Sequence, residues 1–146
     1  MIAPAGPREW LEADGLGGFA MGTESGVRTR RYHSLLTVAT TPPTGRVVLV
    51  AGLEAWVEGP SGPEFLSSHN YAPGVLHPDG HQRLRAFSTE PWPTWTHGLG
   101  DGAVVTTELC CERDSGDVAL RLRLAGGGPR RLLLRPLLAV RDYHGL

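Results

Sequence analysis

Glycine and proline interrupt this sequence so frequently that a helix of more than two turns has almost nowhere to form. The 146 residues include 20 Gly and 12 Pro. Inside a helix, Gly costs about 1 kcal/mol and Pro about 3 kcal/mol relative to Ala. Between these residues lie short apolar or alternating runs, which are typical of β-strands. The predicted strands cover residues 32–39, 46–57, 84–88, 103–111, 118–125 and 131–140.

The clearest alternation lies in residues 118–125, where aliphatic side chains take every second position. Successive side chains of a strand point to opposite faces, so the aliphatic ones share one face and two Arg lie on the other. This pattern predicts a half-buried antiparallel strand. The aliphatic positions are Val118, Leu120, Leu122 and Leu124, and the opposite positions are Ala119, Arg121, Arg123 and Ala125.

Many short strands separated by turn sequences predict an all-β fold, an antiparallel β-sandwich with little or no helix. Stretches such as TPPTG, HPDG and AGGGP supply the turns. A chain of 146 residues is long enough to bury one hydrophobic core. We therefore expect residues 1–146 to form a single domain.

The charged residues argue against a nucleic-acid partner and a membrane span. Fourteen Arg and no Lys face 15 acidic residues, and the net charge is −1. Because the acids are interleaved with the Arg, no basic face is left for phosphates. No segment approaches the roughly 20 apolar residues of a spanning helix. The start of the chain lacks the features of a secretory signal, which predicts a cytoplasmic location.

The cysteines, Cys110 and Cys111, are adjacent. Neighbouring cysteines bridge each other only with strain, and two thiols make neither a disulfide framework nor a metal site. We expect both to be reduced and at least partly buried in a strand, and we expect no bound metal.

Five of the thirteen residues in 14–26 are Gly. Gly15, Gly17 and Ala20 match the G-x-G-x-x-A pattern of dinucleotide-binding loops, but neither a buried strand before it nor a helix after it is indicated. A Walker loop needs a Lys, and Ser25 lacks the G-x-S-x-G context of a hydrolase nucleophile. We therefore expect no cofactor, and we read the stretch as a glycine-rich hairpin crossing a sheet.

The cluster Arg30-Arg31-Tyr32-His33 follows directly. If it begins a strand, Arg30 and Tyr32 share one face and Arg31 and His33 share the other. One pair is then structural, and the other is free to serve a site.

Five motifs follow one another along the chain: EWLEADGLGGFAMGTESGVRTRRYHSLL, TTPPTGRVVLVAGLEAWV, SSHNYAPGVLHPDG, FSTEPWPTWTHGL and LRPLLAVRDYHGL. In this order they resemble the N-terminal domain of bacterial and archaeal-type glycogen debranching enzymes. The first is similar to the family's E-W-L, N-G-L-G-G-[FY]-A-x-G-T and T-R-R-Y-H-G-L-L. Asp14 replaces the more usual Asn, and Ser34 stands where Gly is common. Both remain suited to a turn.

The resemblance implies a β-sandwich that packs against a C-terminal α/α-toroid, the domain that carries amylo-α-1,6-glucosidase activity and its catalytic acids. The family's β-domain would end at residues 141–146. Consistently, none of the 15 acidic residues here forms a recognisable pair of the kind that glycoside hydrolysis needs. We assign no catalytic residue, and we expect no hydrolysis by this chain alone.

Sugar sites combine aromatic faces with side chains that bond hydroxyls. Two residue sets fit that chemistry. For the tryptophans, packing in the core or against another domain is the alternative. For the Arg-Arg-Tyr-His cluster, the alternative is a place at a domain interface or at the rim of an active site. The first set is Asn70, Tyr71, His77, Trp92 and Trp95, and the second is Arg30, Arg31, Tyr32, His33, Arg141, Asp142 and His144.

The sequence thus predicts a domain that scaffolds the catalytic toroid and lines one edge of its substrate cleft, with an α-glucan as the expected ligand of the whole enzyme. Two other hypotheses stay open. In one, the chain is a free-standing α-glucan-binding module. In the other, it is a remnant β-domain whose exposed apolar surface promotes self-association.

Overall fold

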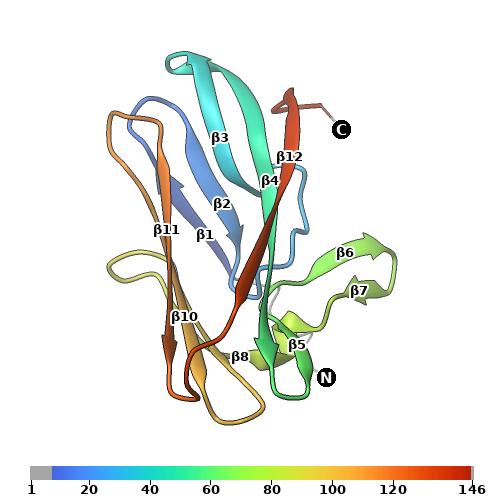
Figure 1. The fold of residues 1–146 in the computed structure, drawn as a ribbon. Helices are drawn as coiled ribbons and strands as arrows, with labels where there is room; N and C mark the ends of the chain where they lie inside the picture. Colours follow the sequence, from blue (N-terminus) through green and yellow to red (C-terminus); the bar gives the residue numbers. More distant parts are fainter. Residues whose placement is uncertain (1–7, 146) are drawn as a thin grey trace, which may run out of the picture.

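A computed structural model describes residues 8–145, which consist almost entirely of strands (Figure 1). All paired strands run antiparallel, as the sequence predicted. The one helical element in this part of the chain is the 3-10 turn η1, Gly80–Arg83. The strands are β1 (Glu9–Ala13), β2 (Phe19–Thr23), β3 (Ser34–Thr41), β4 (Thr44–Gly59), β5 (Gly62–Phe65), β6 (His69–Ala72), β7 (Val75–His77), β8 (Leu84–Ser88), β9 (Thr94–Gly98), β10 (Val104–Cys111), β11 (Val118–Ala125) and β12 (Leu132–Asp142).

The strands form two large sheets and one hairpin. The first sheet has the order β1-β2-β3-β4-β12, with β5 also paired to β4, and the second has the order β11-β10-β9-β8. The hairpin β6-β7 extends away from both sheets (Figure 1). The two large sheets pack on each other as a sandwich. Between them, Trp10 of β1 and Trp95 of β9 meet edge to face with ring centroids 5.3 Å apart. The predicted all-β fold is confirmed.

The core lies between the two sheets. In the β10-β11 pair, Leu120 lies opposite the buried Leu109 and Leu124 lies opposite the buried Val105. The aliphatic face predicted for residues 118–125 therefore lies on the core side of β11. Val118 and Leu122 are half-buried there, whereas Leu120 and Leu124 stay exposed because β11 is an edge strand. Arg121 on the other face pairs with Glu108 at 2.6 Å. Two groups of buried side chains make up the core: Ala55, Val57, Leu66, Leu99, Ala103 and Val105 in one, and Trp10, Ala20, Trp95 and Leu109 in the other.

The glycine-rich stretch is the turn of the β1-β2 hairpin. Asp14 is 4% exposed, and its Oδ1 accepts the backbone N–H groups of Leu16 at 2.7 Å and Gly18 at 2.9 Å. Gly17 has φ +104°, and a Cβ there would lie 2.5 Å from the carbonyl oxygen of Pro43. The glycine-rich stretch is a hairpin turn, as predicted, but its two strands, β1 and β2, were not among the predicted strands.

Predicted strand boundaries agree best where the alternation is strongest. Strands β8 and β11 have the predicted bounds, and β10 and β12 begin one residue later than predicted. The prediction that a strand begins at residue 32 is wrong, since β3 begins at Ser34. Residues 30–33 instead form a turn, closed by the N–H of His33 donating to the carbonyl of Arg30 at 3.1 Å. Strand alternation therefore does not sort this cluster into two faces.

Both cysteines lie on β10, are free, and are half-buried, as predicted. The thiol of Cys111 donates to the carbonyl of Glu12 at 3.3 Å. Burial raises the pKa of this thiol to about 11. Cys111 is therefore a packing residue that joins the second sheet to β1.

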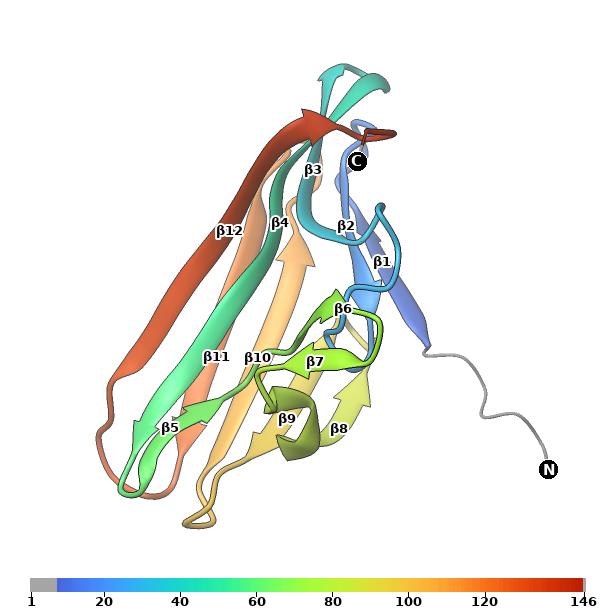
Figure 2. The same cartoon turned by 90° about the vertical axis from the view of Figure 1, so that its right-hand side faces the viewer.

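Strands β11 and β12 are the edges of their sheets, and both lie on the same side of the sandwich (Figures 1 and 2). Large apolar side chains remain exposed along them. Leu138 and Val140 are the most exposed, at 72% each. The others on these two strands are Leu120, Leu124, Leu132 and Leu134. We call these six residues the edge leucine–valine strip.

Candidate functional site

Two segments more than 100 residues apart in the sequence meet beside the first sheet. One is the loop between β2 and β3, which holds residues 30–33, and the other is the turn after β12 (Figure 2). Together with neighbouring side chains they form what we call the aromatic–arginine cluster. Its members are Phe19, Arg31, Tyr32, Arg46, Arg141, Tyr143 and His144.

Arginine side chains tie the two segments together. Nη1 of Arg31 donates to the carbonyl of His144 at 2.9 Å. In the opposite direction, Nη2 of Arg141 donates to the carbonyl of Arg31, and Nη1 of Arg141 donates to the carbonyl of Gly145 at 3.0 Å. Guanidinium groups suit this role because they present several donors in one plane. The two segments thus form one surface.

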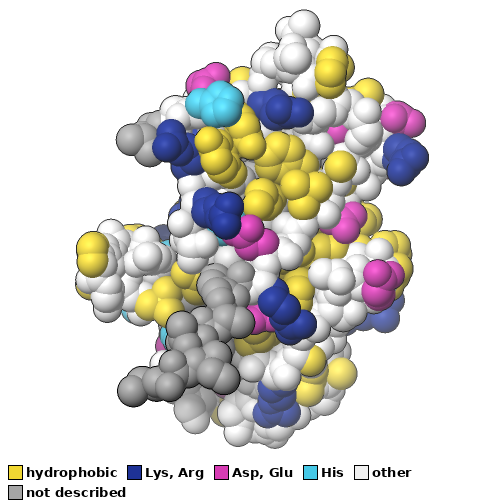
Figure 3. Space-filling model, turned by 180° about the vertical axis from the view of Figure 1, so that it is seen from behind, with side chains coloured by type: hydrophobic (Ala, Val, Ile, Leu, Met, Phe, Trp, Pro, Cys, Tyr) yellow, Lys and Arg dark blue, Asp and Glu magenta, His cyan; other side chains and the backbone are white. Residues whose placement is uncertain are grey.

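Aromatic rings fill the space between these arginines. The rings of Tyr32 and Tyr143 are 4.6 Å apart between centroids, and Phe19 approaches Tyr143 edge to face at 5.6 Å. The guanidinium of Arg46 lies 5.8 Å from the Tyr143 ring centroid, within cation–π range. All three rings are half-buried, whereas Arg31 and His144 are exposed. Figure 3 shows hydrophobic side chains gathered on the upper half of the back of the molecule, with Arg and His side chains beside them.

Asp142 holds the C-terminal turn in place. Its Oδ1 accepts the backbone N–H of His144 at 2.8 Å, and its carbonyl accepts the N–H of Gly145 at 3.0 Å. The side chain is therefore engaged within its own turn. It positions His144 beside Tyr32, where the two rings meet edge to face at 6.0 Å.

His33 is an anchor inside the fold. It is 1% exposed, and its Nδ1 accepts the N–H of Thr29 at 3.0 Å. That contact assigns the ring proton to Nε2, which donates to Oε1 of Glu9 at 3.0 Å. Glu9 also pairs with Arg30 at 2.7 Å. His33 and Arg30 thus fasten the turn to β1, and neither contributes directly to the aromatic–arginine cluster.

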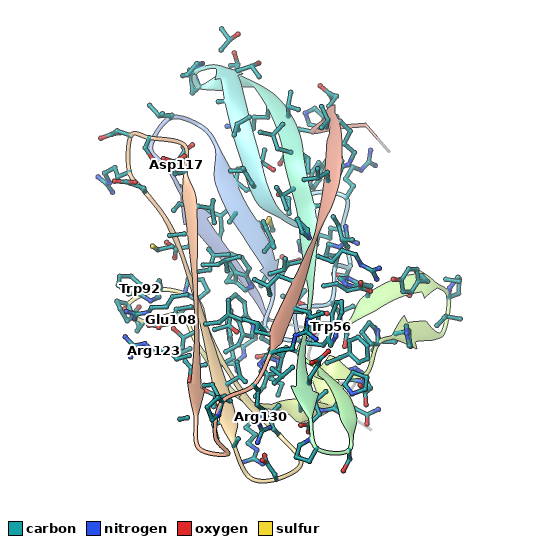
Figure 4. All side chains as sticks on the ribbon, viewed as in Figure 1. Trp56, Trp92, Glu108, Asp117, Arg123 and Arg130 are labelled. Atoms are coloured by element: carbon teal, nitrogen blue, oxygen red, sulfur yellow. The ribbon has the colours of Figure 1, made fainter. Side chains whose placement is uncertain are left out.

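The other predicted residue set does not form one surface. Trp95 is 8% exposed, belongs to the core, and donates its Nε1–H to the carbonyl of Glu24 at 2.9 Å. Trp92 donates to Oε1 of Glu108 at 3.2 Å on the second sheet. Asn70 and Tyr71 are exposed on β6, and His77 lies on β7. Figure 4 shows Trp92 on the opposite side of the molecule from the β6-β7 hairpin.

Three members of the cluster were missed by sequence analysis: Phe19, Arg46 and Tyr143. Tyr143 lies inside the quoted Arg-Asp-Tyr-His run and could have been found from its neighbours. Phe19 and Arg46 had no local signal, because they join the cluster only through contacts across the sheet and the C-terminal turn. The N–H of Tyr143 donates to the carbonyl of Arg46 at 3.0 Å, which fixes that contact.

The cluster offers binding groups instead of acid–base chemistry. Glycoside hydrolysis needs two carboxyl groups that face the bond to be broken. The nearby carboxylates are engaged elsewhere, Asp142 with a backbone N–H and Glu9 with Arg30 and His33. Within residues 8–145, no group of three or more His, Cys, Asp or Glu side chains is arranged to hold a metal ion. Nor does this part of the chain contain a helix long and apolar enough to span a membrane.

Comparison with known families gives one match. The family model described as "Glycogen debranching enzyme N terminal" matches residues 8–146, which is nearly the whole chain. Comparisons with curated proteins and with solved structures gave no significant match. The match agrees with the motifs in the sequence and with the antiparallel sheets of the structure. This chain belongs to the glycogen debranching enzyme N-terminal family.

Proposed function

We propose that this chain is the non-catalytic β-domain of an α-1,6-glucosidase that acts at the branch points of glycogen or limit dextrin. Its role is to dock the catalytic α/α-toroid domain of the same enzyme. The docking surface is the aromatic–arginine cluster, which borders the substrate cleft once the two domains meet. The chain itself carries out no hydrolysis.

The composition of the cluster carries this proposal. Protein interfaces are enriched in Tyr, Phe and Arg relative to the rest of a protein surface, and the residues that dominate binding are commonly Tyr and Arg. Tyr32, Tyr143 and Phe19 offer half-buried rings, and Arg31 adds an exposed cation. The rigid hydrogen bonds between the two segments reduce the entropy lost on docking.

A second candidate is direct binding of an α-glucan by the same cluster. Aromatic rings cover the apolar face of a pyranose, and Arg side chains donate to its hydroxyl groups. The half-buried Tyr32 ring beside the exposed Arg31 and His144 provides that combination on one surface. This candidate requires no second domain.

The test is to mix the chain with the catalytic domain and to measure association by calorimetry, with Tyr32→Ala and Arg31→Glu as variants. Removing an interface hot spot costs about 2 kcal/mol or more, so each variant should weaken association by about thirtyfold. Arg123→Glu is the matched control, because Arg123 is an exposed cation on β11, far from the cluster. Circular dichroism checks that each variant is folded.

Absence of association, or equal weakening by Arg123→Glu, contradicts the docking role. A parallel titration with maltooligosaccharide tests the second candidate. Saturable binding by the chain alone, lost in Tyr32→Ala, favours glucan recognition over docking. A flat titration removes the glucan candidate and leaves the docking role unaffected.

A further inference from the structure

A cavity of about 120 Å³ lies between the two sheets. Its walls are mainly apolar, and they include Trp10 from the first sheet and Trp95 and Leu109 from the second. Arg28, from the loop after β2, and His69, the first residue of β6, also line it. The cavity therefore combines an apolar interior with cationic and hydrogen-bonding groups.

Four buried nitrogen atoms of the cavity lining have no hydrogen-bond partner among the described residues. They are Nε of Arg28, both ring nitrogens of His69, and Nδ1 of His97. His69 is 4% exposed and His97 is 5% exposed. Folded proteins pair almost all buried polar atoms, because an unpaired one costs its full desolvation penalty. These atoms are the polar groups of the lining that a molecule held in the cavity, water or a ligand, would pair with.

The loop after β2 and strand β4 hold Arg28 at this site. The loop before it is closed by Oγ1 of Thr23, which donates to the carbonyl of Val27 at 2.8 Å. The Arg28 side chain then lies over Gly52, where a Cβ atom would come within 3.4 Å of Nε. Arg28 is thus positioned by its loop and by β4, unlike a freely moving surface side chain.

The charges near Arg28 and His69 favour an anion. The positive charges of Arg28 and Arg135 lower the pKa of His69. The carboxylate that raises this pKa, Glu54, is already bound to Arg135. Burial, followed by the charge of Arg28, lowers the pKa of His69, so its ring is neutral at pH 7. A neutral imidazole offers one N–H donor. Arg28 and His69 together therefore provide donors beside an excess of positive charge.

The volume limits the size of the ligand. An apolar protein cavity of about 150 Å³ binds benzene, which has six non-hydrogen atoms. A cavity of about 120 Å³ therefore suits a molecule of about four to six such atoms. A glucose unit, with twice that number, is too large. The ligand of this cavity is thus chemically distinct from the glucan of the proposed function.

We propose that the cavity is a binding site for a small aliphatic monocarboxylate, such as propionate or butyrate. The carboxylate accepts hydrogen bonds from Arg28 and His69, and the short hydrocarbon chain packs between Trp10, Trp95 and Leu109. The site does not depend on docking of the catalytic domain, so either proposal can fail without the other.

Tryptophan indole signals give a direct test, because the chain has four Trp and two of them line the cavity. Butyrate is added to the ¹⁵N-labelled chain, and the indole N–H resonances are followed by NMR. The proposal predicts saturable shifts for Trp10 and Trp95 and none for Trp56 and Trp92, which lie outside the lining. Butyramide, the neutral analogue, should bind at least about tenfold more weakly because it lacks the charge-assisted hydrogen bonds.

Arg28→Gln should weaken butyrate binding by at least about tenfold for the same reason, and Arg123→Gln should leave it unchanged. Two results would overturn the proposal: no saturable shift at Trp10 and Trp95, which is expected if water alone fills the cavity, or equal affinity for butyrate and butyramide. The comparison of these two ligands uses the unaltered chain, so the test stands even if Arg28→Gln does not fold.

Discussion

At the scale of single residues, buried polar side chains set the conformation of this domain. Asp14 closes the turn of the first hairpin with two backbone N–H groups, and His33 joins the next loop to β1 through Thr29 and Glu9. Asp14 stands where the family more commonly has Asn. An Asn oxygen can accept the same two hydrogen bonds, so the replacement fits a structural role. Asp14 holds the turn whose Gly17 carbonyl accepts the Nε–H of Arg46 at 2.6 Å, and His33 holds the loop that carries Arg31 and Tyr32.

His97 makes stability depend on pH. Burial, together with the charge of Arg83, lowers the pKa of His97 from 6.5 to about 4. The unfolded chain therefore binds a proton between these pH values that the folded chain does not bind, and stability is lost as the pH falls through this window. For this residue the full loss is about 3 kcal/mol. His69, whose pKa is also lowered, changes stability in the same direction.

We expect His97→Gln to reduce the loss of unfolding free energy between pH 7 and pH 4.5, because Gln does not titrate. Urea unfolding at the two pH values measures it. An unchanged pH dependence in His97→Gln would show that other groups are responsible.

At the scale of elements, the β1-β2 hairpin depends on glycine at position 17 of its turn. Gly17 combines φ +104° with a Cβ position 2.5 Å from the Pro43 carbonyl. Gly17→Ala should lower the free energy of unfolding by about 2 to 4 kcal/mol, from strain at positive φ and from the clash. Gly26→Ala is matched to it: φ is +74°, but nothing lies within 4 Å of the Cβ position.

Gly26→Ala should therefore cost only about 1 to 2 kcal/mol, the cost of the backbone conformation alone. Urea unfolding of both variants measures the difference between them. Equal losses would mean that the contact between the hairpin turn and Pro43 contributes nothing to stability.

The elements also show which structural features the sequence could predict. Strong alternation located β11 to the residue, and Gly and Pro correctly excluded long helices. Strand β1 was missed because Glu9–Ala13 has a single buried side chain, Trp10, and little periodicity. The late start of β3 was missed because the turn at residues 30–33 depends on Glu9, a partner distant in sequence.

Contacts between segments distant in sequence also limited the prediction of the site. The structure brings Arg31, Tyr32, Arg141 and His144 of the predicted second set together. Their motifs mark both segments of the chain. Trp92 and Trp95 were grouped with β6 residues that lie elsewhere in the molecule. Trp92 lies in the loop before β9 and bonds Glu108, whereas Trp95 lies on β9 and goes into the core. Local sequence does not specify which distant segment a strand residue faces.

At the scale of the whole molecule, the sandwich has two exposed edges on one side. Unprotected edge strands with apolar side chains promote association with other chains. We expect the isolated chain to self-associate through the edge leucine–valine strip, and Leu138→Lys with Val140→Lys to abolish this association. Light scattering after size-exclusion chromatography measures the mass. Leu11→Lys, on the opposite edge strand β1 and 55% exposed in the unaltered chain, should have no effect.

A monomeric unaltered chain, or equal loss of association with Leu11→Lys, would contradict a role for this strip. The strip and the aromatic–arginine cluster share no residue, although Val140 of the strip directly precedes Arg141 of the cluster on β12. Docking of the catalytic domain should therefore persist in Leu138→Lys alone.

The central claim is that this domain meets its catalytic partner through the aromatic–arginine cluster. Hydrogen exchange of the chain, with and without the catalytic domain, tests it most directly. We expect the catalytic domain to slow amide exchange at residues 28–33 and 141–145 and to leave it unchanged at residues 118–125 of β11. No slowing in the first two segments, or slowing confined to β11, would contradict it.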